Sequence, residues 1–387
     1  MEFSERIQEV QPSATLAITS KAKSMIASGE DVVILAAGEP DFDTPEIVKK
    51  AAIEAINDGF TKYTPAGGTA SLKKAICRKL HSENGLEYSP ENIVVSCGAK
   101  HSLYNIFQVL CNPGDEILII SPYWLSYPEM VRLASGTPRF LTTLKKNGYK
   151  VSPEDIKAAI TDKTKAVILN SPSNPAGVVY ERAELEAIAK ICIDSGIKII
   201  SDEIYEKILF DGKKHVSIAS ISDEVKGATI LVNGVSKSFS MTGWRIGYTA
   251  GNKDFIKKIQ TLQSHSTSNP TSISQQAAEC ALVSNMDDIL EANRLEFEKR
   301  RDLLMSLLEG EEKLKPFKPE GSFYLFCDIS GTGMNSMTFA EKLLEEKKVA
   351  VIPGGPFGED SSVRISFATS EKVIEEGMRR IKEWVNE

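Results

Sequence analysis

The sequence of 387 residues contains no hydrophobic run that approaches the ~18 residues needed to cross a bilayer. Residues 1–10 carry charges of both signs and no apolar centre, so we expect no signal peptide and a cytoplasmic protein. Basic residues are the minority, with 46 Lys and Arg against 53 Asp and Glu, and the net charge is −7. A chain with this balance lacks the basic face that binds nucleic acids or anionic membranes, and we expect neither as a partner.

Paired cysteines and clustered histidines are also missing. The six cysteines are scattered without a C-x-x-C pair, and the four histidines show no spacing typical of metal ligands. This pattern favours reduced thiols in a cytosolic protein over a disulfide framework or a zinc site, so we expect no metal. Repeats, low-complexity tracts and flexible linkers are absent as well. The length and the 42% hydrophobic content therefore indicate an ordinary globular protein of two packed domains.

Strand-like and helix-like patterns alternate from residue 93 to about residue 284. Such alternation is typical of an α/β fold with a doubly wound, mostly parallel sheet. After a long charged helix, expected over residues 287–308, the pattern becomes that of a smaller α+β unit. Open α/β sheets bind ligands in the crevice beyond the carboxyl ends of their strands, so the residues that follow each strand are the candidates for a site.

The stretch Asn233–Tyr248 carries the strongest chemical signal and reads N-G-V-S-K-S-F-S-M-T-G-W-R-I-G-Y. A β-branched strand, residues 228–232, leads directly into it. A lysine amine beyond a strand end can form a Schiff base with the carbonyl group of a cofactor or substrate. Lys237 could instead be a solvated loop lysine, as most lysines are. Ser236 and Arg245 favour the functional interpretation, because both are candidate phosphate ligands.

Two further strands end in polar residues. The strand at residues 165–170 runs into S-P-S-N-P-A-G, which contains Asn174, and the strand at residues 197–201 runs into Asp202. An acidic residue at the end of an apolar strand is suitable for meeting a cation, such as a protonated pyridine nitrogen, although it could also be a helix N-cap. In a parallel sheet the strand ends that carry Asn174, Asp202 and Lys237 converge on one edge.

Two glycines follow strands near the N-terminal half. Gly38 lies just after the strand at residues 32–35, where its amide could contact a substrate carboxylate or simply form a turn. Gly98 and Ala99 lie between the strand at residues 93–96 and a helix. A glycine turn at a helix N-terminus is a phosphate cradle, because its free amides and the helix dipole attract anions, although any βα unit can place a glycine there.

Two large side chains complete the candidates. Trp124 follows a strand and could stack on a cofactor ring, or it could only pack against its neighbours. Arg364 lies on the face of the strand at residues 363–367 that the apolar side chains do not share. It could be exposed there, or it could hold a carboxylate with its two-pronged guanidinium.

The chain contains, in order, the motifs G-E-P-D-F, K-Y-T-P-A-G-G, S-P-Y-W-L-S-Y-P, N-S-P-S-N-P-A-G, S-D-E-I-Y, S-K-S-F-S-M-T-G-W-R-I-G-Y, P-E-G-S-F-Y and V-R-I-S-F-A. Together they resemble the class I/II aminotransferases of fold type I, in particular the prokaryotic subgroup of aspartate aminotransferases. The resemblance implies a homodimer with pyridoxal 5′-phosphate at the subunit interface, and amino acids and 2-oxo acids as substrates. It also implies a large domain of residues 41–284 and a small domain of residues 1–40 and 285–387.

The resemblance gives each candidate a role. Lys237 would hold the cofactor covalently and then move the proton, Asp202 would pair with the ring nitrogen, and Tyr205 would bond the ring's phenolic oxygen. The cofactor-binding residues would be Tyr63 from the partner subunit, Gly98, Ala99 and Lys100 through their amides, Trp124, Asn174, Asp202, Tyr205, Ser236, Lys237 and Arg245. The substrate-binding residues would be Gly38, Trp124, Asn174 and Arg364.

The implied reaction is transfer of the amino group of L-aspartate to 2-oxoglutarate by ping-pong half-reactions. One feature departs from the animal-type subgroup, which uses an arginine for the second carboxylate of the substrate: residues 264–274 contain no arginine. The prokaryotic subgroup manages acidic substrates without it, and Gln108, Ser13 and Thr15 are possible polar contacts.

Three alternatives remain open at this point. The protein could use prephenate or aromatic substrates, or it could be a lyase on the same fold. A transcription regulator with an aminotransferase-like domain is disfavoured, because only about 40 residues precede the motifs, too few for a DNA-binding module.

Overall fold

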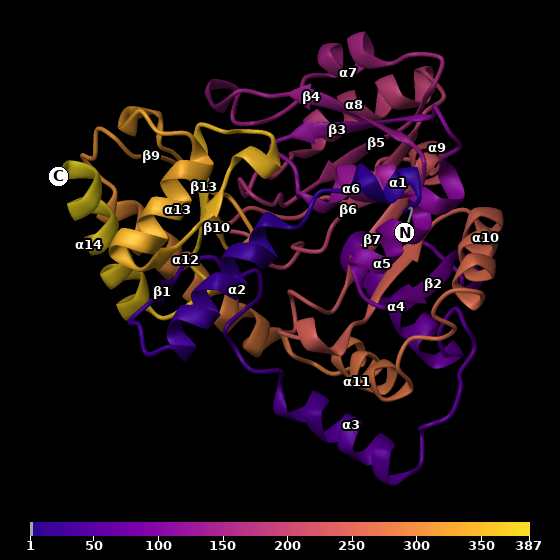
Figure 1. Ribbon diagram of the computed structural model, residues 1–387. Helices are drawn as coiled ribbons and strands as arrows, with labels where there is room; N and C mark the ends of the chain where they lie inside the picture. The colour runs from indigo at the N-terminus through magenta and orange to yellow at the C-terminus, as the bar shows by residue number, and fades with distance from the viewer. Residues whose placement is uncertain (1–2) are drawn as a thin grey trace.

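The computed structural model describes residues 3–387 and contains a larger sheet, a smaller sheet and a separate two-stranded pair (Figure 1). The larger sheet has seven strands in the order β2-β8-β7-β6-β5-β3-β4. Strand β8 runs antiparallel to both of its neighbours, and the other adjacent pairs are parallel. The strands are β2 (Ile93–Ser96), β3 (Glu116–Ser121), β4 (Thr137–Thr142), β5 (Thr164–Asn170), β6 (Lys198–Asp202), β7 (Thr229–Gly234) and β8 (Gly247–Ala250).

Helices cover both faces of this sheet, which explains why its central strands are apolar throughout. On one face, α5 (Ala99–Leu110), α6 (Ser126–Leu133) and α10 (Lys253–Ser264) pack against side chains such as Ile119 and Ile200. The opposite face is covered near β5 and β6 by α7 (Pro153–Ala159), α8 (Arg182–Asp194) and α9 (Asp223–Ala228). Near β2 and β8 it is covered by α3 (Glu46–Asn57), α4 (Ala70–Asn84) and α11 (Ser272–Val283).

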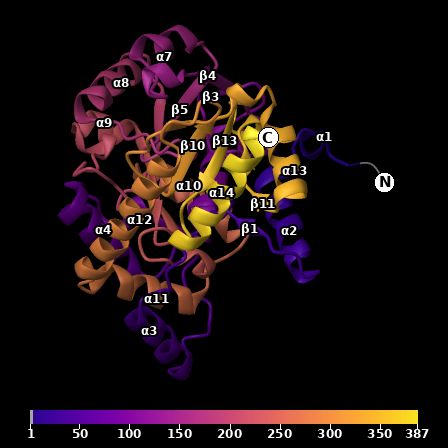
Figure 2. The same cartoon turned by 90° about the vertical axis from the view of Figure 1, so that its left-hand side faces the viewer.

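The smaller sheet is antiparallel, with the order β12-β13-β10-β9. Its strands are β9 (Lys315–Phe317), β10 (Tyr324–Asp328), β12 (Ile352–Pro353) and β13 (Ser362–Ser366). The helices α12 (Asp287–Leu307), α13 (Ser336–Lys347) and α14 (Glu371–Asn386) lie beside it (Figure 2). The core between them contains buried aromatic side chains such as Phe297, Phe323 and Phe339.

Segments near both ends of the chain meet in this smaller unit. Strand β1 (Val33–Ile34) pairs in parallel with β11 (Val349–Ala350), so that Val33 lies opposite Val349. Helix α2 (Ala14–Ala27) contacts both β11 and β12, and Figure 1 shows it beside the C-terminal helices. A short helix, α1 (Glu5–Gln8), precedes it. The structure therefore confirms an α/β fold with a mostly parallel sheet and a smaller unit that receives both termini.

Two local features of the chain depend on neighbouring elements or residues. Residues 349–353 form two short strands and not one, because β11 pairs in parallel with β1 and β12 pairs antiparallel with β13. Helix α3 begins at Glu46, with Pro45 as its N-cap. Among residues 3–387, no helix combines the length and the apolar character that a membrane span requires.

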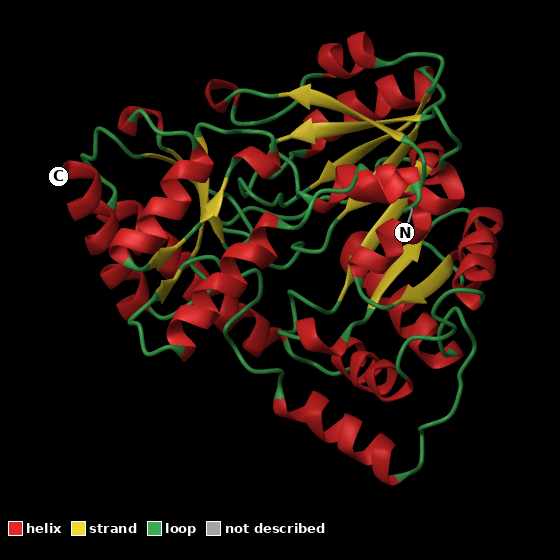
Figure 3. Ribbon diagram, viewed as in Figure 1, coloured by secondary structure: helices red, strands yellow, loops and turns green. Residues whose placement is uncertain are grey.

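The carboxyl ends of β5, β6 and β7 lie side by side. Asn170 is paired with Asp202, and Asp202 is paired in turn with Val232. The arrowheads of β3, β4 and β5 in Figure 3 point toward the smaller sheet. The loops that follow these parallel strands thus open between the two sheets, as expected for a ligand site.

Candidate active site

A cavity of about 620 Å³ lies at this edge, a size suited to a cofactor or small substrate. Both sheets and α2 contribute to its wall. The sequence-predicted residues that line it are Gly38, Ala99, Lys100, Trp124, Asn174, Asp202, Tyr205, Ser236, Lys237, Arg245 and Arg364. Gly98 lies just behind the wall, next to Arg245.

Lys237 extends into the cavity from the loop after β7. Its Nζ donates to the carbonyl oxygen of Gly38 at 2.6 Å and lies 5.9 Å from the centre of the Tyr205 ring. Burial lowers the pKa of Lys237 to about 8, and the cations Arg364 and Arg245 also lower it, while Glu39 acts in the opposite direction. A substantial fraction of this amine is therefore neutral near physiological pH, as a nucleophile or proton acceptor must be.

Asp202 is buried at the end of β6 and is held by Tyr127, a residue that the sequence did not single out. Tyr127 Oη donates to Asp202 Oδ2 at 2.6 Å, and the amide of Ile204 donates to Oδ1 at 3.3 Å. Burial raises the pKa of Asp202 to about 6, against the lowering effect of the Tyr127 hydrogen bond. The sequence feature that could have indicated Tyr127 is its place in the motif S-P-Y-W-L-S-Y-P, three residues after Trp124.

Replacement of Asp202 by asparagine should stabilise the cofactor-free protein while it damages activity. The pKa of Asp202 is about 6 in the folded protein, above the ordinary value of 3.8. The folded state therefore favours the protonated carboxyl group, and it loses stability relative to the unfolded state as the pH rises from the ordinary pKa through the folded-state pKa. The variant should therefore exceed wild type by about 1–3 kcal/mol in free energy of unfolding at neutral pH, with no difference below about pH 4. Urea unfolding at both pH values measures this.

The same variant should lose about tenfold or more in turnover, because an amide cannot hold a proton on a ring nitrogen as a carboxylate does. Wild-type turnover together with a pH-independent stability difference would show that Asp202 is only a structural residue.

An anion cradle lies where α5 begins. The first amides of this helix, those of Ala99 and Lys100, have no partner within the helix. Gly98 must be glycine, because its φ is +88° and a Cβ would lie 2.5 Å from Arg245 Nη2. Arg245 also donates to the carbonyl oxygens of Thr242 and Cys97, at 2.9 and 3.2 Å, which fixes the guanidinium beside the helix N-terminus. With the Ser236 hydroxyl, this arrangement suits a phosphate group.

Arg364 is the most deeply buried cation of the cavity wall, with 2% of its surface exposed. Its Nη1 donates to Asn174 Oδ1 at 3.0 Å and its Nη2 donates to the Ala36 carbonyl oxygen at 3.2 Å. Nε has no partner among the described residues. Both acceptors are neutral, and a buried charge without a counter-ion is costly, so this guanidinium in the cavity wall suits an anion.

The aromatic residues of the cavity wall contact its charged residues and one another. The Nζ of Lys100 lies 4.9 Å from the centre of the Trp124 ring, and Tyr127 meets that ring edge-to-face at 5.3 Å. Tyr324, a second residue that the sequence did not single out, lies in the cavity wall beneath Arg364. The sequence feature that could have indicated Tyr324 is its place at the end of the motif P-E-G-S-F-Y, where β10 begins.

Other candidates are placed differently. Tyr63 is 92% exposed and does not line this cavity, so its role across a subunit interface stays a prediction. Gln108 donates to the carbonyl oxygen of Leu133 at 3.0 Å and also lies outside the wall. Ser13 and Thr15 do line it, and Thr15 Oγ1 is buried without a partner among the described residues.

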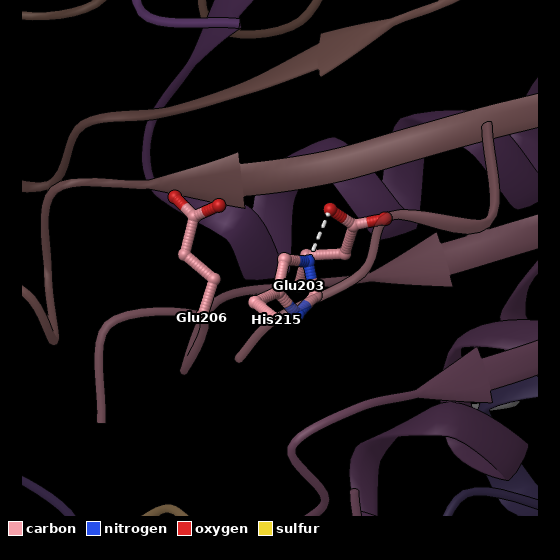
Figure 4. Close-up of side chains that lie close together, drawn as sticks. All are labelled: Glu203, Glu206 and His215. Carbon is pink, nitrogen blue, oxygen red and sulfur yellow. Dashed lines mark hydrogen bonds and ion pairs between the residues drawn. The ribbon is translucent and has the colours of Figure 1, made fainter. Parts of the chain in front are cut away.

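A second group of ionisable side chains, Glu203, Glu206 and His215, comes from the segment that follows β6, and the three lie close together (Figure 4). The three are close enough to share a metal ion, and His215 Nε2 lies 2.8 Å from Glu203 Oε2. Each of the four carboxylate oxygens, however, already accepts a hydrogen bond. The donors are His215, Ser201, Ser217, Lys79 and Asn84. The protein's own donors therefore satisfy the carboxylates of the cluster, and we assign no metal to it.

Comparison with known proteins agrees with this geometry. Residues 30–381 match the family model described as aminotransferase class I and II. An aspartate aminotransferase of Bacillus sp. (strain YM-2) is 53% identical over 98% of each chain. A probable aspartate/prephenate aminotransferase of Rickettsia prowazekii (strain Madrid E) is 48% identical over 99% of each chain. The solved structure of an aspartate aminotransferase from Thermus thermophilus with maleate is 42% identical, covers 99% of both chains and superposes with a TM-score of 0.96.

Lys237 follows β7 and lines the cavity between the larger and the smaller sheet, and this arrangement is that of the fold type I pyridoxal-phosphate enzymes. Within that class the chain belongs to the class I and II aminotransferase family. The wall of the cavity fits the cofactor: the cradle at Gly98 suits its phosphate, Asp202 its ring nitrogen and Lys237 its aldehyde carbon. The protein is thus a pyridoxal-phosphate-dependent transaminase with amino acids and 2-oxo acids as substrates.

Proposed function

We propose that this transaminase moves the amino group of L-aspartate to 2-oxoglutarate, which yields oxaloacetate and L-glutamate in two half-reactions. The observation that carries the proposal is the buried guanidinium of Arg364 in the cavity wall, which pairs with no carboxylate among the described residues and suits the α-carboxylate that all four compounds share. A second cation, Lys100, remains for the distal carboxylate, and its ammonium group lies over the ring of Trp124. Ser13 and Thr15 also line the same cavity. The names of the similar proteins from Bacillus and Thermus also support aspartate.

We assign the cofactor contacts as follows. Ser236, Arg245 and the amides of Gly98, Ala99 and Lys100 hold the phosphate, while Trp124 stacks on the ring. Asn174 and Tyr205 bond the phenolic oxygen, Asp202 bonds the ring nitrogen, and Lys237 provides the covalent link. Gly38 and Asn174 assist Arg364 in holding the substrate. The deep burial of Asp202 and Arg364 supports these roles, since neither charge has another counter-ion in direct contact.

When bound, the cofactor supplies an electron sink for the bond that breaks at the substrate α-carbon. Arg364 orients the substrate by its α-carboxylate, so that the α-proton faces Lys237. Lys237 Nζ, with a pKa of about 8, can then accept this proton and return it. Asp202, as a carboxylate, holds the proton of the ring nitrogen in place. Movement of the smaller unit toward the large sheet would exclude water from the cavity.

We further propose a cytoplasmic homodimer whose two active sites lie at the interface, with Tyr63 reaching the partner's cavity. The exposure of Tyr63, at the tip of the loop between α3 and α4, supports this arrangement. Helix α3 also presents the exposed apolar side chains Ile47, Ile53 and Ile56, as expected of a surface that another subunit covers. The domains in this proposal are residues 41–284 and, together, residues 1–40 and 285–387.

A half-reaction screen tests the proposed activity. Each of the twenty amino acids is mixed with the purified enzyme without a 2-oxo acid, and the absorbance of the bound cofactor is followed. Aspartate and glutamate should convert it to its amino form fastest, because only they engage both Arg364 and Lys100. Aromatic amino acids should react more slowly and alanine least.

The same screen distinguishes the alternatives. A preference for phenylalanine or tyrosine over aspartate would favour an aromatic or prephenate enzyme. Release of ammonia with regeneration of the original cofactor spectrum would indicate a lyase instead.

A further inference from the structure

Tyr324 lies between the residue proposed for the substrate carboxylate and a residue proposed for the cofactor. It begins β10, is 1% exposed, and lines the cavity. The guanidinium carbon of Arg364 lies 4.2 Å from the centre of its ring. On its other side, Tyr324 Oη lies 3.1 Å from Tyr205 Oη, within hydrogen-bond distance.

The strand register explains this placement. In the antiparallel pair of β10 and β13, Phe326 is opposite Arg364 and Tyr324 is opposite Ser366. Arg364 is thus the diagonal neighbour of Tyr324 on the same face of the sheet, near enough for a long side chain to cover an aromatic ring. The two tyrosine rings meet nearly at right angles, with 5.9 Å between their centres, so that their hydroxyl groups converge.

We propose that Tyr324 is a positioning residue that couples Arg364 to Tyr205. Its hydroxyl group donates a hydrogen bond to the Tyr205 hydroxyl, while its ring supports the guanidinium of Arg364. The proposal rests on the proposed function, in which Tyr205 donates to the phenolic oxygen of the cofactor. With its own proton committed there, Tyr205 can only accept from Tyr324. Hydrogen bonds in such a chain polarise one another, so Tyr324 strengthens the bond that Tyr205 makes.

The charge of Arg364 affects how strongly Tyr324 donates its hydrogen bond to Tyr205. Burial raises the pKa of Tyr324, whereas Arg364 above its ring lowers it, and a more acidic hydroxyl is a stronger donor. A substrate carboxylate neutralises Arg364 and so weakens the donor. Arrival of the substrate at one end of the chain would thereby reduce the hydrogen bonding to the cofactor oxygen at the other end.

The test is the pH at which the absorbance of the bound cofactor changes in the holoenzyme. Tyr205→Phe should raise this midpoint by about one pH unit, because it removes a direct hydrogen bond to the phenolic oxygen. Tyr324→Phe should raise it by about 0.3 unit, as expected for the loss of one cooperative partner. The double variant should equal Tyr205→Phe alone, since both changes keep the ring beneath Arg364 and the Tyr324 hydroxyl has Tyr205 as its hydrogen-bond partner.

Three further measurements separate this role from simple packing. Tyr324→Phe keeps the ring beneath Arg364, so KM for carboxylic substrates should stay unchanged, whereas Tyr324→Leu should raise KM for all of them. Tyr180→Phe is the matched control: it removes an equally buried hydroxyl, which accepts from the amide of Val151 at 3.1 Å, and should leave the midpoint unchanged.

The outcomes are distinct. If Tyr205→Phe shifts the midpoint and Tyr324→Phe does not, the coupling is overturned and the proposed function stands. If the double variant shows the sum of the two single shifts, Tyr324 acts independently of Tyr205 and the coupling is again overturned. If Tyr205→Phe itself has no effect, the assignment of Tyr205 in the proposed function fails, and the coupling fails with it.

Discussion

Replacement of Lys237 by alanine should abolish turnover, with a loss of about 10³-fold or more, because the variant lacks both the covalent link and the group that moves the proton. Cofactor binding should persist, since the cradle at Gly98, Arg245 and the ring contacts do not depend on this amine. Single-turnover kinetics and equilibrium dialysis of the cofactor measure the two effects separately.

Borohydride reduction of the wild-type enzyme, followed by peptide mapping, provides the direct assignment. The label should be found on Lys237, and a label on Lys100 or Lys23, which also line the cavity, would contradict the proposal. Lys207→Ala is the control for Lys237→Ala and should keep its turnover, because Lys207 pairs with Glu83 at 2.8 Å and does not line the cavity.

Replacement of Arg364 should lower kcat/KM to a similar extent for every substrate. Arg364→Lys keeps the charge and removes the fork, so kcat/KM should fall by a similar factor for aspartate, glutamate, phenylalanine and alanine. Arg364→Ala should be worse, with a loss of at least ~2 kcal/mol in transition-state binding, because the α-carboxylate then enters the site unpaired.

Lys100→Met supplies the contrast. It removes the proposed partner of the distal carboxylate alone, so it should reduce kcat/KM for aspartate and glutamate and spare phenylalanine and alanine. Should Arg364→Lys instead impair only the dicarboxylic substrates, the substrate would bind in the reverse orientation, with its distal carboxylate on Arg364.

The sequence predicted the strand ends better than the contacts between them. Asn174, Asp202 and Lys237 could be assigned to one edge because hydrophobic runs locate strands, and parallel strands share the direction of their ends. Arg364 could be placed on one face of its strand by alternation alone. The same alternation could not decide between an exposed arginine and one that is 2% exposed, since that depends on which elements cover the face.

The residues that were missed act through other side chains. Tyr127 reaches Asp202 from α6, and Tyr324 reaches Tyr205 from β10. Each contact joins segments that are distant along the chain, and no local pattern records which hydroxyl will meet which acceptor. The division of residues 349–353 between two sheets was unpredictable for a related reason: the partner strands β1 and β13 lie at opposite ends of the sequence.

The pairing of β1 with β11 constrains the order of events on the ribosome. Helix α2 and β1 are made long before their partners, residues 349–353. The seven-stranded sheet, whose last strand along the chain ends at residue 250, can form in the meantime. Helix α2 and β1 therefore lack these contacts until residues 349–353 have been made. A nascent chain arrested shortly before residue 349 should accordingly display a protease-resistant large sheet and a protease-sensitive N-terminus.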